Sequence, residues 1–285
     1  MPIVSYSEIL GRAKAEGYAV GCFNIVNDTT LYACLDTAEA QRSPIILAFS
    51  QGHLDYVNMP RLLKIMEMIS ADASVPVCIM LDHATEESVI DAALDCGVGA
   101  VMYDLSSQPF EKHIQRMRAM VEKCHARGVQ VEGELGRHGS RWSGAQSGSF
   151  SSRQKTDPAL LPRYIAETGV DGLAIYVGNN HSKFDPAAKL DLTLLDEIDA
   201  LTDIPLVLHG SSGLDSEDVR VMVGHGVLKV NHYTDVSRAG VHALREALAI
   251  PTWTDYHALP RFAESAMSKV VLAKLKVLGS TGRAQ

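Results

Sequence analysis

The chain has 285 residues, of which 46% are hydrophobic and 21% charged, so it has the apolar content of a folded protein and not of a disordered one. Its net charge of −8 argues against a broad surface for nucleic acid or for an anionic membrane. No apolar stretch approaches the roughly 20 residues of a membrane span, and no signal peptide is visible at the N-terminus. The five cysteines lie in apolar stretches without a C-x-x-C pair, which is typical of a reducing compartment. We therefore expect a soluble cytoplasmic protein.

Short apolar runs alternate with segments of helical periodicity along the chain. We predict strands at 19–25, 44–50, 76–83, 100–105, 129–135, 172–178, 205–210 and 227–231. Their nearly continuous apolar character is typical of strands buried on both faces of a parallel sheet. Two helical stripes between them consist of Val89, Ile90, Ala93 and Leu94, and of Ile114, Met117, Val121 and Cys124. Eight β-then-α units without a linker predict an α/β fold, a single-domain (β/α)8 TIM barrel over 1–285.

One alternative to the barrel is an open doubly wound sheet, but no G-x-G-x-x-G pattern follows the first predicted strand. The irregular stretch at about 136–157 is rich in Gly and Ser and carries several basic side chains. Because it follows the fifth strand, we expect a long mobile loop at the mouth of the barrel.

Nearly every predicted strand ends in a polar group that is able to do chemistry. In a barrel these ends meet at one opening, where catalytic groups gather. The groups are Asn24, Ser50, Asp82, His83, Asp104, Glu134, His209 and Asn231, with His181 three residues beyond Gly178.

Three of these side chains are histidines, at positions 83, 181 and 209. Neutral imidazole is a common zinc ligand, and three protein ligands with an open fourth position are typical of catalytic zinc. For one histidine alone, a buried side chain with a satisfied hydrogen bond is the simpler interpretation, but the joint placement favours a metal site. Histidines within the helical segments are interpreted as surface residues, for example His113, His125 and His242.

Asp82 directly precedes His83, and adjacent strand residues point to opposite faces. Both can face the barrel axis only if the strand already turns there. An ionised aspartate beside a dication can exchange a proton with a substrate hydroxyl. The alternative is that Asp82 caps a helix beginning near Thr85.

Glycine and serine follow the seventh strand as Gly210, Ser211 and Ser212, and Asn231 to Thr234 follow the eighth. Glycine lets backbone N–H groups approach a phosphate, and a helix N-terminus adds partial positive charge. Barrels frequently hold phosphate after these two strands, so we expect a phosphate site here.

Several segments in the correct order resemble the class II fructose-bisphosphate and tagatose-bisphosphate aldolases over essentially the full chain. They are FNIVN at 23–27, SPIILAFSQG at 43–52, LDH at 81–83, MYDLSSQPFEKHI at 102–114, VEGELG at 131–136, TGVDGLAIYVGNNH at 168–181, LVLHGSSGL at 206–214, KVNHYTD at 229–235 and GSTGRA at 279–284. The resemblance implies reversible cleavage of a ketose phosphate to dihydroxyacetone phosphate and an aldehyde, through an enediolate that zinc stabilises.

The resemblance also implies roles for single residues. It makes His83, His181 and His209 the ligands of one zinc ion per subunit, and Asp82 the acid/base at the C4 hydroxyl. Glu134 matches an alternative or second-site metal ligand, and a monovalent cation is a further cofactor to consider. The matched substrate-binding positions are Asn24, Ser50, Asp104, Ser106, Gly178, Ser182, Gly210, Ser212, Asn231 and Thr234. A sugar phosphate as substrate and a homodimer or homotetramer are expected.

The sequence departs from the family after the fifth strand, where 137–143 carries no acid in place of the usual C3 proton donor. Arg141, with Arg137, Arg153 or Lys155, can clamp a distal phosphate, carboxylate or sulfonate; the alternative is a solvated basic loop. A Schiff-base aldolase needs a buried lysine at a strand end, and the one lysine there, Lys229, belongs to the matched motif.

Two other interpretations remain open. A metal-dependent hydrolase barrel also gathers His and Asp at its strand ends, but this first strand has no H-x-H pair. A non-catalytic relative or assembly subunit would explain the missing loop acid.

Overall fold

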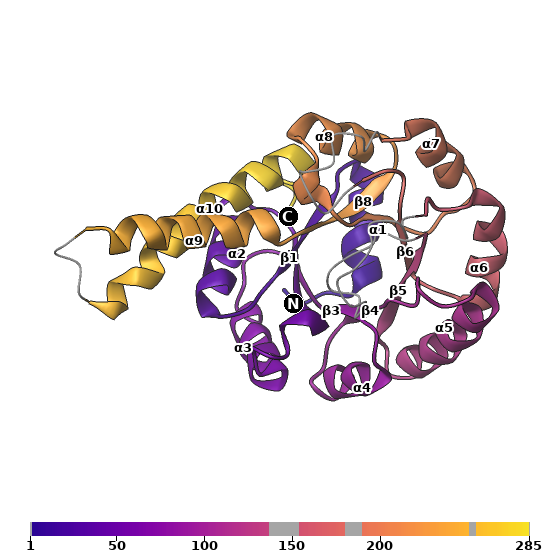
Figure 1. Ribbon diagram of the computed structural model, residues 1–285, viewed down its shortest axis with the longest axis horizontal. Helices are drawn as coiled ribbons and strands as arrows, with labels where there is room; N and C mark the ends of the chain where they lie inside the picture. The colour runs from indigo at the N-terminus through magenta and orange to yellow at the C-terminus, as the bar shows by residue number, and fades with distance from the viewer. Residues whose placement is uncertain (1, 137–153, 180–189, 251–254, 285) are drawn as a thin grey trace.

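The computed structural model describes residues 2–136, 154–179, 190–250 and 255–284. Eight parallel strands form a closed barrel in chain order, and the last strand pairs with the first. The strands are β1 Val20–Asn24, β2 Ile45–Ser50, β3 Val77–Ala84, β4 Ala100–Tyr103, β5 Gln130–Leu135, β6 Gly172–Ile175, β7 Leu206–Leu208 and β8 Val227–His232. Helices surround the barrel, as Figure 1 shows, and the predicted (β/α)8 TIM barrel is confirmed.

The helices follow the strands in the expected alternation. Their bounds are α1 Tyr6–Glu16, α2 Asp28–Ala40, α3 Met59–Ser70, α4 Glu87–Asp95, α5 Phe110–His125, α6 Leu161–Thr168, α7 Leu192–Ala200, α8 Ser216–Gly224, α9 Thr234–Leu248 and α10 Leu259–Leu278. Short 3₁₀ turns are η1 Gln51–His53, η3 Pro158–Leu160, η4 Ser211–Gly213 and η5 Tyr256–Ala258. The predicted stripe of α5 is buried throughout, and the stripe of α4 is buried except for Val89, which is half-buried.

Several strands are shorter than predicted, and β6 and β7 fall furthest short of their predicted bounds, because the backbone after each of them is bound by side chains or turns away. After β6, the backbone N–H of Tyr176 donates to Thr156 Oγ1 at 2.9 Å, and that of Val177 donates to Asn179 Oδ1 at 2.9 Å. After β7, Gly210 takes a left-handed φ of 71°, which turns the chain away from the sheet.

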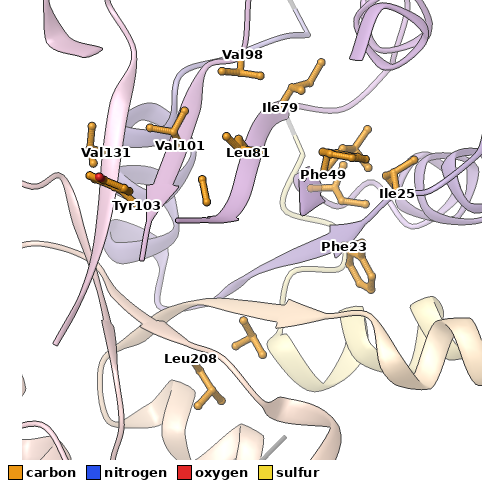
Figure 2. Packing of buried hydrophobic residues seen from close by; sticks show 14 of the residues in the cluster. Phe23, Ile25, Phe49, Ile79, Leu81, Val98, Val101, Tyr103, Val131 and Leu208 are labelled. Carbon is orange, nitrogen blue, oxygen red and sulfur yellow. The ribbon is translucent and has the colours of Figure 1, made fainter. Parts of the chain in front are cut away.

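Alternation along the strands separates two apolar layers. Outward-facing side chains pack between the barrel and the helices; Figure 2 shows Phe23, Phe49, Leu81 and Val101 among them. The inward-facing set forms a separate cluster along the barrel axis, comprising Val20, Cys22, Ile46, Ala48, Cys78, Met80, Ala100, Met102, Ala174 and Val207. Because the side-chain period of a strand is two, the next inward positions towards the C-terminal ends are the polar residues of the candidate site.

Helix α1 closes the N-terminal end of the barrel. Its buried side chains Tyr6, Ile9, Leu10 and Ala13 join the axial cluster, and the backbone N–H of Val4 just before it bonds to the carbonyl of Val77, at the start of β3. At the other end of the chain, α9 and α10 run side by side and extend beyond the barrel as an arm (Figure 1).

Within the described ranges, no helix combines the length and the apolar character that a membrane crossing requires. The five cysteines are free, and all but the half-buried Cys96 are buried. Most of the predicted loop lies outside the described residues, at 137–153, but its end is held in place: Thr156 is buried and Lys155 pairs with Asp191.

Candidate active site

The strand ends bring the predicted polar side chains into one buried group at the C-terminal mouth of the barrel. Two residues beyond the inward-facing Cys22, Ala48, Met80 and Met102, the same face of each strand carries a polar residue. These residues, with Glu134 of β5 and Asn231 of β8, are 9% exposed or less: Asn24, Ser50, Asp82, Asp104, Glu134 and Asn231. Strand periodicity thus places them together although the chain separates them widely.

The backbone at the end of β3 explains how Asp82 and His83 can both face the barrel axis. His83 takes a left-handed φ of 48°, and the register with β4 shifts between Leu81 and Ala84. This turn swings the His83 side chain towards the mouth, where Asp82 already points. A left-handed conformation is costly for a residue other than glycine, and such strain is concentrated at functional sites. Asp82 is not a helix cap, because α4 begins at Glu87, with Glu86 at its cap position.

Two amides hold the Asp82 carboxylate. Asn24 Nδ2 donates to Oδ2 at 2.9 Å, and Asn231 Nδ2 donates to Oδ1 at 3.0 Å. Burial opposes ionisation, but His83, His209 and Lys229 outweigh it and hold the pKa of Asp82 below its ordinary value. Asp82 is therefore ionised at neutral pH, with both oxygens oriented. Asn24 Oδ1 has no hydrogen-bond partner among the described residues and is free to accept from a ligand.

Asp82, His83 and His209 form one candidate ligand group. One ligand atom from each lies within 4.8 Å of the others, and the two imidazole centroids are 4.5 Å apart. His83 also belongs to a second such group with Asp104 and Glu134. His83 Nδ1 lies 3.6 Å from Asp104 Oδ2, an ion-pair distance too long for a hydrogen bond.

A buried carboxylate behind His209 fixes the orientation of its ring. His209 Nε2 lies 2.9 Å from Glu132 Oε1, and Lys229 Nζ lies 2.9 Å from Glu132 Oε2. A carboxylate paired with an ammonium accepts hydrogen bonds, so Nε2 of His209 carries the hydrogen and Nδ1 keeps the lone pair that a metal needs. Burial lowers the pKa of Lys229, but Cys22 and Glu132 raise it more, to a value above its ordinary range. Lys229 is therefore a protonated structural cation and not the neutral amine of a Schiff-base enzyme.

The buried side chains at the mouth of the barrel carry an excess of negative charge, which a bound cation would neutralise. Among the described residues, four carboxylates are buried here, those of Asp82, Asp104, Glu132 and Glu134, against one buried ammonium, that of Lys229. Burial disfavours a charge on His83, yet Asp82, Asp104 and Glu134 raise its pKa to about 9, because they attract positive charge to this point. Imidazole and carboxylate donors with an excess of negative charge fit a divalent metal ion.

The segments after β7 and β8 lie where the phosphate site was expected. Gly210 precedes the 3₁₀ turn η4, and Thr234 begins α9. The Ser211 hydroxyl is buried and committed to the protein, since it donates to the Asn231 carbonyl at 2.7 Å and lies 3.0 Å from His232 Nδ1. Ser211 therefore offers a ligand only its backbone, whereas Ser212 is half-buried.

Some of the remaining predicted site positions lie among the described residues, and others lie outside them. Gly178 is described, with a φ of 98°, and the Ser106 hydroxyl donates to Asp104 Oδ1 at 2.7 Å. Lys155, an alternative member of the predicted clamp for a distal anion, pairs with Asp191 at 2.7 Å. Outside the described residues lie His181, Ser182 and Arg141, with Arg137 and Arg153.

Two residues of the site, Glu132 and Asn179, were not predicted from the sequence, and one histidine that was interpreted as a surface residue is buried. Glu132 orients His209. It lies two residues before Glu134 in the same strand, so the sequence already indicated that its side chain faces inward. Asn179, fully buried, donates to the His209 carbonyl at 2.8 Å and so joins the ends of β6 and β7. His113 is 3% exposed and lies 2.9 Å from the Tyr164 hydroxyl, so its interpretation as a surface residue was wrong.

Comparisons with known proteins identify the family and support the fold. The family model described as fructose-bisphosphate aldolase class-II matches residues 4–283. The crystal structure of the YdjI aldolase from Escherichia coli K12 is 27% identical in sequence, with a TM-score of 0.88 over 99% of this chain and all of that one. The fructose-bisphosphate aldolase of Campylobacter jejuni, at 24% identity, shares the fold with a TM-score of 0.82 over 98% of this chain and 96% of that one. The chain belongs to the class II fructose-bisphosphate aldolase family.

Proposed function

We propose that this protein is a zinc-dependent aldolase that cleaves a ketose phosphate or bisphosphate reversibly to dihydroxyacetone phosphate and an aldehyde. The observation that carries the proposal is the convergence of Asp82, His83 and His209 within 4.8 Å at the mouth of the barrel. A general base beside a group of imidazole ligands is the combination that a metal-assisted carbon–carbon cleavage needs.

His83 and His209 would hold the zinc ion, with His181 as the third ligand and Glu134 as an alternative one. Zinc bound there would act as a Lewis acid on the C2 carbonyl of the ketose. Other parts of the protein orient two of these ligands. Glu132 fixes the His209 ring, and the left-handed turn at position 83 presents the His83 ring to the same point.

Asp82 acts as the general base for cleavage. Its ionised carboxylate takes the proton of the C4 hydroxyl, the oxygen electrons form the aldehyde C=O bond, and the C3–C4 bond breaks. The electron pair left on C3 is conjugated with the C2 carbonyl. One proton added at C3 completes dihydroxyacetone phosphate, and release of the proton that Asp82 took from the C4 hydroxyl balances the reaction and regenerates the base. Asn24 and Asn231 keep both Asp82 oxygens in position, so little reorganisation is needed at the proton transfer.

The phosphate of the dihydroxyacetone half would bind the backbone around Gly210 and Ser212 and the first turn of α9 at Thr234, where helix N–H groups attract an anion. Basic residues of the loop after β5, Arg141 above all, would hold an anionic group at the far end of the substrate. A phosphate, a sulfonate or a carboxylate would suit that position.

We also propose that the chain forms a homodimer or homotetramer. The exposed large hydrophobic side chains are concentrated on two regions, and only Leu201 lies elsewhere in the described part of the chain. The regions are the α2–α3 side of the barrel, with Tyr32, Leu54, Tyr56, Ile65 and Met68, and the α9–α10 arm, with Val241, Leu248, Ile250 and Tyr256. Sedimentation velocity tests this proposal, and a monomer at micromolar concentration would contradict it.

Two variants separate the metal from the base. Asp82→Asn should keep bound zinc and lose dihydroxyacetone phosphate release, whereas His209→Ala should lose both. Zinc is measured by elemental analysis, and release is measured with a coupled dehydrogenase over a panel of ketose phosphates that carry a distal phosphate, sulfonate or carboxylate. Normal zinc content in His209→Ala would contradict the ligand set. Wild-type protein that binds zinc but cleaves no ketose phosphate would instead favour a non-catalytic relative.

A further inference from the structure

A hydroxyl from the closed, N-terminal end of the barrel reaches the group that orients a proposed zinc ligand. Tyr6 is the first residue of α1, is fully buried, and belongs to the axial apolar cluster. Its hydroxyl donates to Glu132 Oε2 at 2.6 Å, across 126 positions of sequence. Figure 1 shows α1 behind the centre of the barrel.

The carboxylate of Glu132 is held by three donors, which come from α1, from β8 and from the residue that follows β7. Oε2 accepts from Tyr6 of α1 and from Lys229 of β8, and Oε1 lies against His209 Nε2 at 2.9 Å. The Lys229 ammonium also donates to Asn231 Oδ1 at 2.7 Å, so it serves two acceptors at once. Because Tyr6 and Lys229 both bind Oε2, Oε1 is left to accept the hydrogen bond from His209.

The position of the Tyr6 hydroxyl is itself fixed by packing. A β-carbon added at Gly172 of β6 would lie 2.5 Å from this oxygen, so the ring fills the space that glycine leaves. Burial, together with the Glu132 charge, raises the pKa of Tyr6 well above its ordinary value, and the phenol therefore remains a donor at any physiological pH.

We propose that Tyr6 is a positioning residue for the metal site: by fixing the Glu132 carboxylate, it holds the His209 ring with Nδ1 towards His83 and Asp82. This inference rests on the proposed function, because it assigns Tyr6 a part in holding the zinc ion. Partners that orient a metal-ligating histidine typically change metal affinity about 10- to 100-fold when they are removed.

Tyr6→Phe tests the proposal because it removes the hydroxyl and keeps the ring. The matched control is Tyr164→Phe, which removes an equally buried hydroxyl, one that lies 2.9 Å from His113 and outside the Glu132 network. Zinc affinity is measured by competition with a chromogenic chelator, and the ligand geometry is followed by the visible spectrum of the cobalt-substituted protein. Tyr6→Phe should weaken zinc binding about 10-fold or more and shift the cobalt bands. The control should do neither.

A second comparison keeps the proposal testable if both substitutions lower stability. If Tyr6 acts through Glu132, then Tyr6→Phe introduced into a Glu132→Gln background should leave zinc affinity unchanged. Equal zinc affinity and equal cobalt spectra in Tyr6→Phe and Tyr164→Phe would overturn the proposal, as would an additive effect in the Glu132→Gln background. Failure of wild-type protein to bind zinc would instead overturn the proposed function.

Discussion

Replacing Lys229 with methionine removes the only buried cation that faces Glu132 among the described residues. Both side chains are fully buried, and Lys229 Nζ lies 2.9 Å from Glu132 Oε2 and 2.7 Å from Asn231 Oδ1. Methionine has a similar length, so the substitution leaves little empty space. What it leaves is a carboxylate in the barrel interior without its compensating charge.

The expected cost follows from that geometry. Breaking a fully buried ion pair by removing one partner typically destabilises a protein by about 3–5 kcal/mol. That is a large share of the roughly 5–15 kcal/mol that holds most domains folded. Replacing both partners removes the unpaired charge, so the Glu132→Gln/Lys229→Met protein should be more stable than Lys229→Met alone.

Urea unfolding followed by circular dichroism measures these differences, with metal chelated so that zinc does not mask them. The reasoning predicts a lower transition midpoint for Lys229→Met, with partial recovery in the double variant. A loss below about 1 kcal/mol, or a double variant that loses the sum of the two single losses, would refute the buried ion pair as described.

Three further predictions address other parts of the barrel. Burial, only partly offset by Asp104, lowers the folded-state pKa of His113 to about 4, so the unfolded chain binds a proton first as the pH falls below about 6.5. Stability should therefore decline by about 3 kcal/mol between those values, and a His113→Gln variant that declines equally in urea titrations would contradict this. Gly133→Ala should destabilise by about 1–3 kcal/mol, because the added carbon would lie 2.4 Å from the Tyr164 hydroxyl; Tyr164→Phe should relieve that loss, and failure of such rescue would count against the clash. Borohydride added during turnover should leave the protein unmodified by mass spectrometry, since Lys229 is protonated, and a substrate adduct on it would show Schiff-base chemistry.

The sequence predicted the architecture well because strand and helix periodicities are local properties. Apolar runs located all eight strands, and the stripe of α5 was buried as expected. The ends of β6 and β7 were placed too late, because Thr156 and Asn179 bind the backbone after β6 and Gly210 turns the chain after β7. No local pattern reveals the two side-chain contacts. His113 lies on the same helix face as Met117 and Met120, so its burial could have been recognised from spacing.

The candidate site was partly predictable for the same reason. Period-two alternation places Asn24, Asp82 and Asp104 inward, and the sequence alone indicated their convergence. The orientation of His83 depends on a left-handed backbone conformation, which the residue types at this position do not predict. The contact between Tyr6 and Glu132 joins opposite ends of the barrel, and only the folded chain shows it.

The most direct test of the account is a crystal structure of the protein grown with zinc, with anomalous diffraction recorded at the zinc edge. The account predicts one strong peak at the barrel mouth, about 2.0–2.1 Å from Nδ1 of His209 and from a ring nitrogen of His83, beside the Asp82 carboxylate. A mouth without a zinc peak, or a peak that is bound without His83 and His209, would contradict it.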